Sequence, residues 1–170
     1  MFLDRCCNPM SLQERFLEEI KANHRIIRKV CLVYAHTRDD QEDLFQECLY
    51  NAWKAFPNFR RDAKFSTWLY KVALNTALYH KRKNKSAFME VDFELAQHPS
   101  IEQDDNDHLA KLYQAIAILN AIEKSVILLY LEGLSYREIG EITGFTETNV
   151  GAKLSRIKDK LKNIIIKNGF

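Results

Sequence analysis

Residues 131–161 read LEGLSYREIGEITGFTETNVGAKLSRIKDKL, and this stretch holds dense helix start and stop signals. Ser135, followed three residues later by Glu138, forms a capping box that opens a short helix. Gly144 suits the left-handed residue that ends this helix, and Thr146 suits the N-cap of the last helix. Two helices joined by a turn of about four residues form a helix-turn-helix pattern, although an ordinary αα-hairpin has the same spacing. The side chains expected to face inward are Ile139, Ile142, Phe145, Val150, Leu154 and Ile157.

The outer face of the last helix, which is expected to run to about Lys167, is polar and basic. One stripe, with spacings of four, three and four, consists of Asn149, Lys153, Arg156 and Lys160. Polar side chains near the start of such a helix reach base edges in the major groove, while Lys and Arg farther along neutralise phosphates. This basic face favours DNA binding over a plain hairpin. The candidates for sequence readout are Thr148, Asn149 and Lys153, whereas Lys158 and Lys162 are expected to remain solvated.

The rest of the chain also predicts helices. It has only 5 glycines and 3 prolines, and its apolar residues recur at spacings of three and four, so no strand is expected. In the N-terminal half, one helix is expected from a Ser11–Glu14 capping box to about His36, a second from Asp39 or Asp40 to Pro57, and a third from a Ser66 cap over 67–83. Cys31, Cys48 and Trp53 are interpreted as core residues, and the same is expected of Phe65, Trp68 and Tyr70. Farther on, an apolar pattern covers 109–119, and an Asn120–Glu123 box opens a helix over 121–132 with Gly133 at its C-cap.

The composition excludes several classes of protein. The chain has 170 residues, 46% of them hydrophobic and 28% charged, and its formal net charge is +2. No apolar run is long enough to span a bilayer, and the first residues lack the apolar core of a secretory signal, so we expect a cytoplasmic protein without membrane insertion. The four cysteines show no CxxC pair and no zinc-ligand spacing with histidines, so neither metal nor cofactor is expected. Catalytic motifs are also missing, which predicts that the protein is not an enzyme.

Charge is segregated along the chain. Residues 60–85 hold eight basic residues against Asp62 alone, and residues 153–167 hold six against Asp159 alone. Between them, residues 90–107 hold seven acidic residues and no Lys or Arg. Two basic helical segments that flank an acidic one favour nucleic-acid binding over a merely solvated surface.

Two further surfaces stand out. The second helix has an acidic edge, formed by Asp43, Gln46 and Glu47, that suits a basic protein partner. In the third helix, Thr67, Lys71, Asn75, Leu78 and Arg82 share one face. Before it lies the basic aromatic run 58–61, which suits single-stranded or opened nucleic acid because bases stack on aromatic rings while cations follow the backbone.

The run 43–83, DLFQECLYNAWKAFPNFRRDAKFSTWLYKVALNTALYHKRK, resembles conserved region two of the extracytoplasmic-function sigma factors of bacterial RNA polymerase. The run 131–161 resembles their region four. The resemblance implies an all-α protein with two small helical domains, an N-terminal bundle and a C-terminal helix-turn-helix domain, joined by an acidic linker. The expected boundaries are a disordered leader at 1–10, region two at 11–84, the linker at 85–105 and region four at 106–170.

The resemblance also implies an alternative sigma factor that binds core RNA polymerase, recognises the minus-thirty-five and minus-ten promoter elements and helps to open the DNA. Its expected partners are core polymerase, promoter DNA and an anti-sigma factor, and it is expected to be a monomer without them. The implied polymerase contacts are Asp43, Leu44, Gln46 and Glu47. The implied minus-ten contacts are Asn58, Phe59, Arg60, Arg61, Lys64, Ser66, Lys71, Asn75 and Arg82. The implied minus-thirty-five contacts are Ser135, Thr146, Thr148, Asn149, Lys153, Arg156 and Lys160. The chain departs from the family at Gly151 and Ala152, where Lys and Ser are common.

Two other functions use some of the same features. A stand-alone helix-turn-helix regulator, with an N-terminal bundle that senses a signal or dimerises, has no need for the acidic edge followed by a basic aromatic loop. An RNA-binding adaptor would use the basic aromatic surfaces but would leave the helix-turn-helix unexplained.

Overall fold

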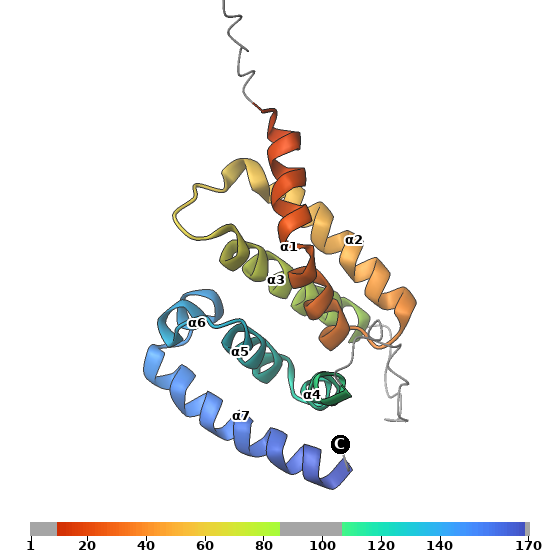
Figure 1. The fold of residues 1–170 in the computed structure, drawn as a ribbon, viewed down its shortest axis with the longest axis vertical. Helices are drawn as coiled ribbons and strands as arrows, with labels where there is room; N and C mark the ends of the chain where they lie inside the picture. The colour runs from red at the N-terminus through yellow and green to blue at the C-terminus, as the bar shows by residue number, and fades with distance from the viewer. Residues whose placement is uncertain (1–9, 86–106, 169–170) are drawn as a thin grey trace, which may run out of the picture.

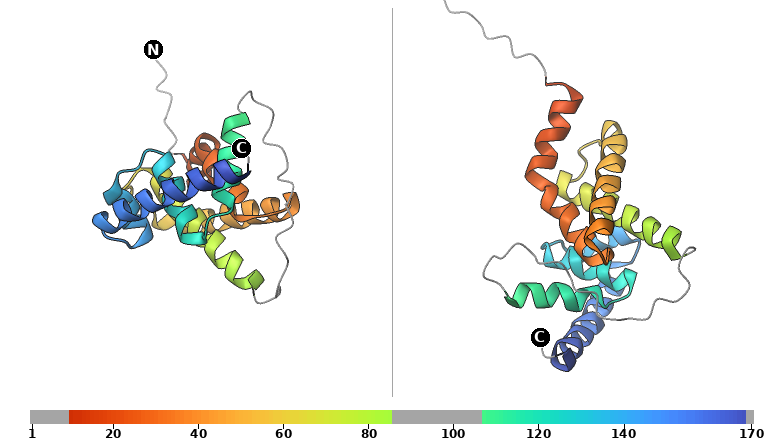
Figure 2. Two further views of the ribbon diagram at one scale, coloured as in Figure 1. Left: turned by 90° about the horizontal axis from the view of Figure 1, so that it is seen from below. Right: turned by 90° about the vertical axis from the view of Figure 1, so that its right-hand side faces the viewer.

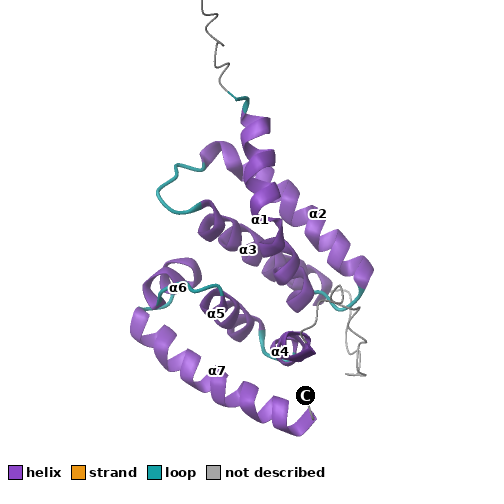
Figure 3. Cartoon of the chain, in the orientation of Figure 1, coloured by secondary structure: helices purple, strands orange, loops and turns teal. Residues whose placement is uncertain are grey.

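The computed structural model describes residues 10–85 and 107–168, and every regular element within these ranges is a helix (Figures 1 and 3). The all-α prediction is confirmed for this part of the chain. All but the last residue of the predicted leader and the first residue of the predicted acidic linker lie outside the described residues. None of the described helices is long and apolar enough to cross a membrane.

The N-terminal bundle consists of three helices and a short 3-10 turn. Ser11 and Glu14 form both hydrogen bonds of the predicted capping box at the start of the first helix. That helix ends two residues before His36, where the backbone becomes extended. The elements are α1 (Leu12–Tyr34), α2 (Arg38–Ala55), η1 (Phe56–Asn58) and α3 (Phe65–Lys85).

Two predicted helix starts were wrong. The N-cap of α2 is Thr37, whose Oγ1 accepts a hydrogen bond from the Asp40 N–H at 3.1 Å. Asp39 and Asp40 therefore lie in the first turn, where acidic side chains are stabilised by the positive end of the helix dipole. Helix α3 begins at Phe65, so Ser66 lies inside its first turn and is not its cap.

The C-terminal half forms a second helical bundle, and its predicted capping motifs are confirmed. The Asn120 side chain accepts hydrogen bonds from the Ile122 and Glu123 N–H groups, and the Ser135–Glu138 box is complete. Gly144 has φ +80°, the left-handed conformation predicted for the residue after the short helix. The elements are α4 (Asp107–Ala117), α5 (Ala121–Leu131), α6 (Tyr136–Thr143) and α7 (Glu147–Asn168).

Buried side chains from both bundles form one continuous core. Cys31 and Cys48 are buried in it, as predicted. Trp53 was predicted to be a core residue, but it is 38% exposed and packs at the edge of the core against Phe16, with the ring centroids 5.1 Å apart. The apolar positions of the helix-turn-helix point inward as predicted, with Ile139, Val150, Leu154 and Ile157 buried and Ile142 and Phe145 half-buried.

The two bundles are in direct contact. Helices α4 and α5 pack against α1, and α5 also packs against α3. Figure 1 shows α4–α7 below α1–α3, and the turned views keep the same contact along the C-terminal end of α1 (Figure 2).

Candidate protein and nucleic-acid interfaces

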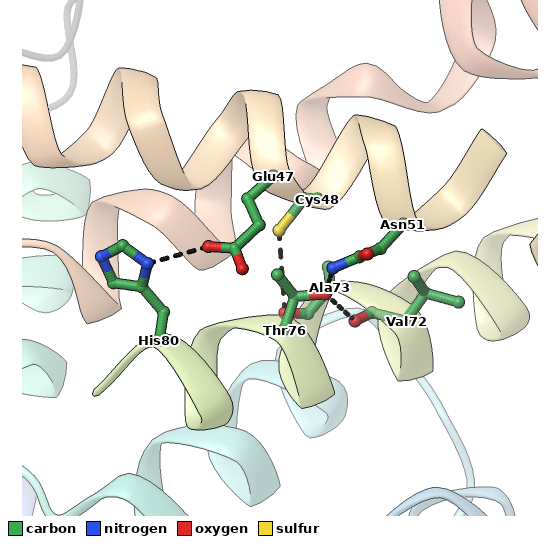
Figure 4. A network of polar contacts seen from close by, with 7 residues as sticks. All are labelled: Glu47, Cys48, Asn51, Val72, Ala73, Thr76 and His80. Carbon is green, nitrogen blue, oxygen red and sulfur yellow. Dashed lines mark hydrogen bonds and ion pairs between the residues drawn. The ribbon is translucent and has the colours of Figure 1, made fainter. Parts of the chain in front are cut away.

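The acidic edge of α2 is a single solvent-facing surface. Asp43 and Gln46 are exposed, and Glu47 lies beside them with its side chain 37% exposed. Helical spacing places the three residues on one face. His80 of α3 donates a hydrogen bond from Nδ1 to Glu47 Oε2 at 2.9 Å, so the Glu47 carboxylate is held in place by the neighbouring helix (Figure 4). Sequence reasoning missed His80 because its partner lies 33 residues away.

Leu44 does not belong to this surface. It was expected to contact a partner together with the acidic edge, but it is 1% exposed and belongs to the core of the bundle. Its position between Asp43 and Gln46 on the helix turns it inward, and its burial holds α2 in place.

A polar network fixes α2 against α3 (Figure 4). The Asn51 Nδ2 donates to Thr76 Oγ1 at 3.2 Å, and the Thr76 hydroxyl donates to the Val72 carbonyl at 2.9 Å. Next to it, the Cys48 thiol lies 3.8 Å from the Ala73 carbonyl. Hydrogen bonding to Cys31 and burial raise the pKa of the Cys48 thiol, so it remains neutral. The two helices therefore present their outer faces as one rigid unit.

The loop before α3 exposes three cations. Arg60, Arg61 and Lys64 are all exposed, and Asn58 lies exposed at the end of η1. Arg61 has φ +60°, a left-handed conformation that is uncommon for a residue other than glycine and costs on the order of 1–3 kcal/mol. The start of α3 has no acidic residue in its first turn, so Lys64 adds its charge to the positive end of the helix dipole. The loop is therefore a positive surface suited to phosphate groups.

Phe59 anchors this loop and is not a free stacking platform. Its ring lies 5.0 Å from Trp68, 5.7 Å from Phe65 and 6.3 Å from Phe56, measured between centroids. The ring is half-buried in this cluster, and its contact with an unpaired base stays a prediction. Ser66 is half-buried in the first turn of α3.

The outer face of α3 continues the loop surface. Lys71 and Asn75 are exposed and one helical turn apart, as the predicted stripe requires. Tyr79 lies one turn farther along and is 64% exposed, although it was absent from the expected contacts. Its spacing of four from Asn75 was the signal that could have identified it. Arg82 belongs to the same helix, but its side chain lies outside the described residues.

The turn of the helix-turn-helix depends on Gly140 as well as Gly144. A Cβ on Gly140 would lie 2.5 Å from the Phe145 carbonyl oxygen, so only glycine permits this close approach of the chain. Ser135 is exposed, but its hydroxyl and N–H are bonded to Glu138 at 2.7 and 2.8 Å. These bonds lower the pKa of the Glu138 carboxyl. Thr146 Oγ1 accepts from the Asn149 N–H at 3.3 Å, as expected of an N-cap.

The basic stripe of α7 is divided between exposed and engaged residues. Thr148, Asn149 and Arg156 are exposed near the start and middle of the helix. Lys153 is half-buried, with its Nζ 4.7 Å from the centroid of the Phe145 ring. Lys160 forms an ion pair with Glu123 of α5 at 2.8 Å, so its charge is already engaged within the bundle.

Two neighbours of this stripe contact aromatic side chains. Lys158 was expected to be simply solvated, but its Nζ donates to the Tyr130 hydroxyl at 3.0 Å and lies 4.1 Å from the ring centroid. The hydrogen bond to Tyr130 raises the pKa of Lys158. Gly151 faces Tyr136 of α6.

Two family models match the chain. Sigma-70 region 2 matches residues 20–87, and Sigma-70 region 4 matches residues 109–161, so the two matches together cover most of the chain. The first match contains the acidic edge, the basic loop and the outer face of α3. The second contains α6, the turn and α7 as far as Leu161.

Curated relatives and solved structures agree with these matches. The chain is 28% identical to the RNA polymerase sigma-H factor of Pseudomonas aeruginosa, over 84% of this chain and 81% of the relative. It is 29% identical to the RNA polymerase sigma factor SigV of Bacillus subtilis, over 75% and 77%. Its fold is similar to that of the sigma factor RpoE of Bartonella quintana, solved in complex with the anti-sigma factor NepR. The TM-score is 0.69 and the identity 22%, over 89% of this chain and 96% of that one.

Proposed function

This chain belongs to the extracytoplasmic-function sigma factors of the sigma-70 family and directs RNA polymerase to promoters, and we propose how its surfaces divide that work. Residues 11–84 serve as region two and residues 106–170 as region four, joined by the acidic segment 85–105. The protein acts in the cytoplasm as a monomer, catalyses no reaction itself and is regulated by an anti-sigma factor.

The acidic edge of α2 docks on core RNA polymerase. The observation that carries this assignment is the exposed trio of Asp43, Gln46 and Glu47, with the Glu47 carboxylate fixed by His80 at 2.9 Å. A carboxylate that is already oriented loses less side-chain entropy when it binds a basic partner. The surface therefore fits a basic protein partner and repels the DNA backbone.

The basic loop and the outer face of α3 bind the minus-ten element. Arg60, Arg61 and Lys64 neutralise the backbone, and Lys71 and Asn75 contact the strand along α3. Tyr79 joins this surface as a stacking platform for an unpaired base, because it is the aromatic side chain left exposed on this face. Phe59 holds the loop in position by packing against Trp68.

The start of α7 reads the minus-thirty-five element. Thr148 and Asn149 face solvent at the N-terminal end of the helix, where side chains reach base edges. Arg156 binds a phosphate farther along. Lys153 lies over Phe145 and contributes charge to the surface, while Ser135, Thr146 and Lys160 position the helix through their contacts within the bundle.

The polymerase assignment is tested by equilibrium binding of labelled protein to core RNA polymerase. The double variant Asp43→Arg/Glu47→Arg is expected to weaken binding at least about tenfold, because two attractive charges become repulsive. The matched control Glu18→Arg/Asp159→Arg makes the same charge change at two exposed positions away from this edge. Equal affinity of both double variants would remove the acidic edge from the polymerase interface.

A further inference from the structure

One edge of α7 is engaged with its own bundle. Lys153 lies over the ring of Phe145, in the turn before the helix, and Lys160 pairs with Glu123 of α5 at 2.8 Å. Both lysines belong to the basic stripe that the sequence predicts to face DNA. Helical spacing therefore places this stripe beside the core of the bundle, and two of its four residues already have partners there.

The opposite edge of α7 is engaged as well. Gly151 lies against Tyr136 of α6, where a Cβ would be 3.4 Å from Tyr136 Cε2. About two turns farther along, Lys158 donates to the Tyr130 hydroxyl of α5 at 3.0 Å. Between the two edges, the inner side of the helix is buried and consists of Val150, Leu154, Ile157 and Leu161. The side opposite these residues is turned away from the bundle, on the outside of the molecule (Figure 1).

The outward side of α7 begins with two methyl-bearing side chains. At about 3.6 residues per turn, the positions on this side are Thr148, Ala152, Ser155 and Asp159, and all four are exposed. Thr148 lies in the first turn of α7 and Ala152 one turn later, so their side chains are about 6 Å apart along the helix. The N-terminal turns of a recognition helix are the part that contacts base edges. The two methyl groups are therefore placed where bases would be read.

Asp159 limits how far the outward side of α7 can follow the DNA. It is exposed about two turns beyond Ala152, and its carboxylate repels phosphate groups. Arg156, which borders the outward side, is exposed and instead suits a phosphate. Base contacts on this side are therefore expected near the start of the helix, at Thr148 and Ala152.

We propose that Thr148 and Ala152 read the 5-methyl groups of two thymines in the minus-thirty-five element. Thymine presents this methyl group in the major groove, where the methyl groups of alanine and threonine side chains can contact it. The contact is favourable because both apolar groups leave water. The spacing of about 6 Å between the two side chains corresponds to about two base-pair steps of about 3.4 Å each. This inference rests on the proposed function, because it requires α7 to lie in the major groove.

The test first removes the methyl groups from the DNA. The sequence that the full-length protein prefers is selected from a duplex library in which the minus-thirty-five element is randomised. Each thymine of the selected duplex is then replaced singly by deoxyuridine, which lacks the 5-methyl group but keeps the same hydrogen-bonding groups. The wild type is expected to bind about fourfold more weakly at each of two thymines, because the burial of one methyl group contributes about this factor. At the other thymines, its affinity should not change.

Two variants then remove the methyl groups from the protein. Thr148→Ser keeps the hydroxyl and loses the methyl group, and Ala152→Ser places a hydroxyl where the methyl group was. Each variant is expected to reduce the effect of deoxyuridine at one of the two thymines to less than about twofold and to leave the other effect unchanged. The matched controls Thr37→Ser and Ala22→Ser make the same changes at exposed positions of the N-terminal bundle and should keep both fourfold effects.

The outcomes separate this readout from the function on which it rests. Equal affinity for the thymine and deoxyuridine duplexes at every position would overturn the methyl readout but leave sequence-specific DNA binding in place. Deoxyuridine effects that persist in both Thr148→Ser and Ala152→Ser would also overturn it, because other groups would then contact the thymine methyls. If the wild type selected no sequence from the library, the proposed minus-thirty-five function would fail together with the readout.

Discussion

The substitution Gly140→Ala tests the turn between α6 and α7, on which the placement of α7 depends. The added Cβ would lie 2.5 Å from the Phe145 carbonyl oxygen, and this oxygen belongs to the backbone and cannot rotate away. Overpacking of this kind costs about 1–3 kcal/mol, whereas the change from glycine to alanine inside a helix returns about 1 kcal/mol. We expect a net loss of up to about 2 kcal/mol in the free energy of unfolding.

Gly151→Ala is the matched control, because it makes the same chemical change in the next helix. Its Cβ would lie 3.4 Å from Tyr136 Cε2, which is ordinary contact with a side chain. Without a clash, the helix propensity of alanine should raise the free energy of unfolding by about 1 kcal/mol.

The assay is thermal unfolding followed by circular dichroism, together with binding to minus-thirty-five duplex DNA. Gly140→Ala should lower Tm by about 5 °C and weaken DNA binding, while Gly151→Ala should raise Tm by about 3 °C. If Gly140→Ala were as stable as Gly151→Ala, the close approach of α6 and the turn would be refuted.

Three further predictions address the two DNA-binding and polymerase-binding surfaces and the capping box of α6. Arg156→Ala should weaken minus-thirty-five binding for all sequences and reduce the slope of log K against log salt concentration by about one. Asn149→Ala should instead change which sequences are preferred. Binding to a promoter library at several salt concentrations separates the two effects. His80→Ala should weaken polymerase binding about threefold, because the Glu47 carboxylate is no longer held in place. An unchanged affinity in a titration with core polymerase would contradict this role of His80. Because the pKa of Glu138 is lowered in the folded protein, its carboxylate stabilises the fold above the unfolded-state pKa, and this contribution is lost as pH falls through the folded-state pKa. The stability advantage of wild type over Glu138→Gln in urea unfolding should therefore shrink as the pH falls below the usual pKa of a glutamate, about 4.5.

The sequence predicted those parts of the fold whose signals are local. The Ser135–Glu138 box, the Asn120 cap and the left-handed Gly144 are each decided by a few consecutive residues, and all three are confirmed. The start of α2 was wrong because Thr37 and two aspartates compete for one cap. Propensity does not separate such neighbours, since threonine and aspartate are both good N-caps.

Contacts between distant residues were beyond sequence reasoning. Lys124 stands in the apolar run 121–131 and gives no sign that its ammonium reaches the end of α1. Phe59 lies in a basic aromatic run that is typical of nucleic-acid contacts, but three rings from other positions enclose it. In both cases the role is decided by which helices pack together, and a single sequence does not contain that information.

The packing of α2 against α3 connects the proposed polymerase-binding surface of the N-terminal bundle with its proposed minus-ten surface. The Glu47–His80 and Asn51–Thr76 hydrogen bonds both join α2 to α3. They therefore fix the position of the acidic edge relative to α3. Lys71 and Asn75 lie on the same helix as His80 and face solvent. Docking of the acidic edge on polymerase would therefore fix the orientation of the minus-ten surface without any further rearrangement within the bundle.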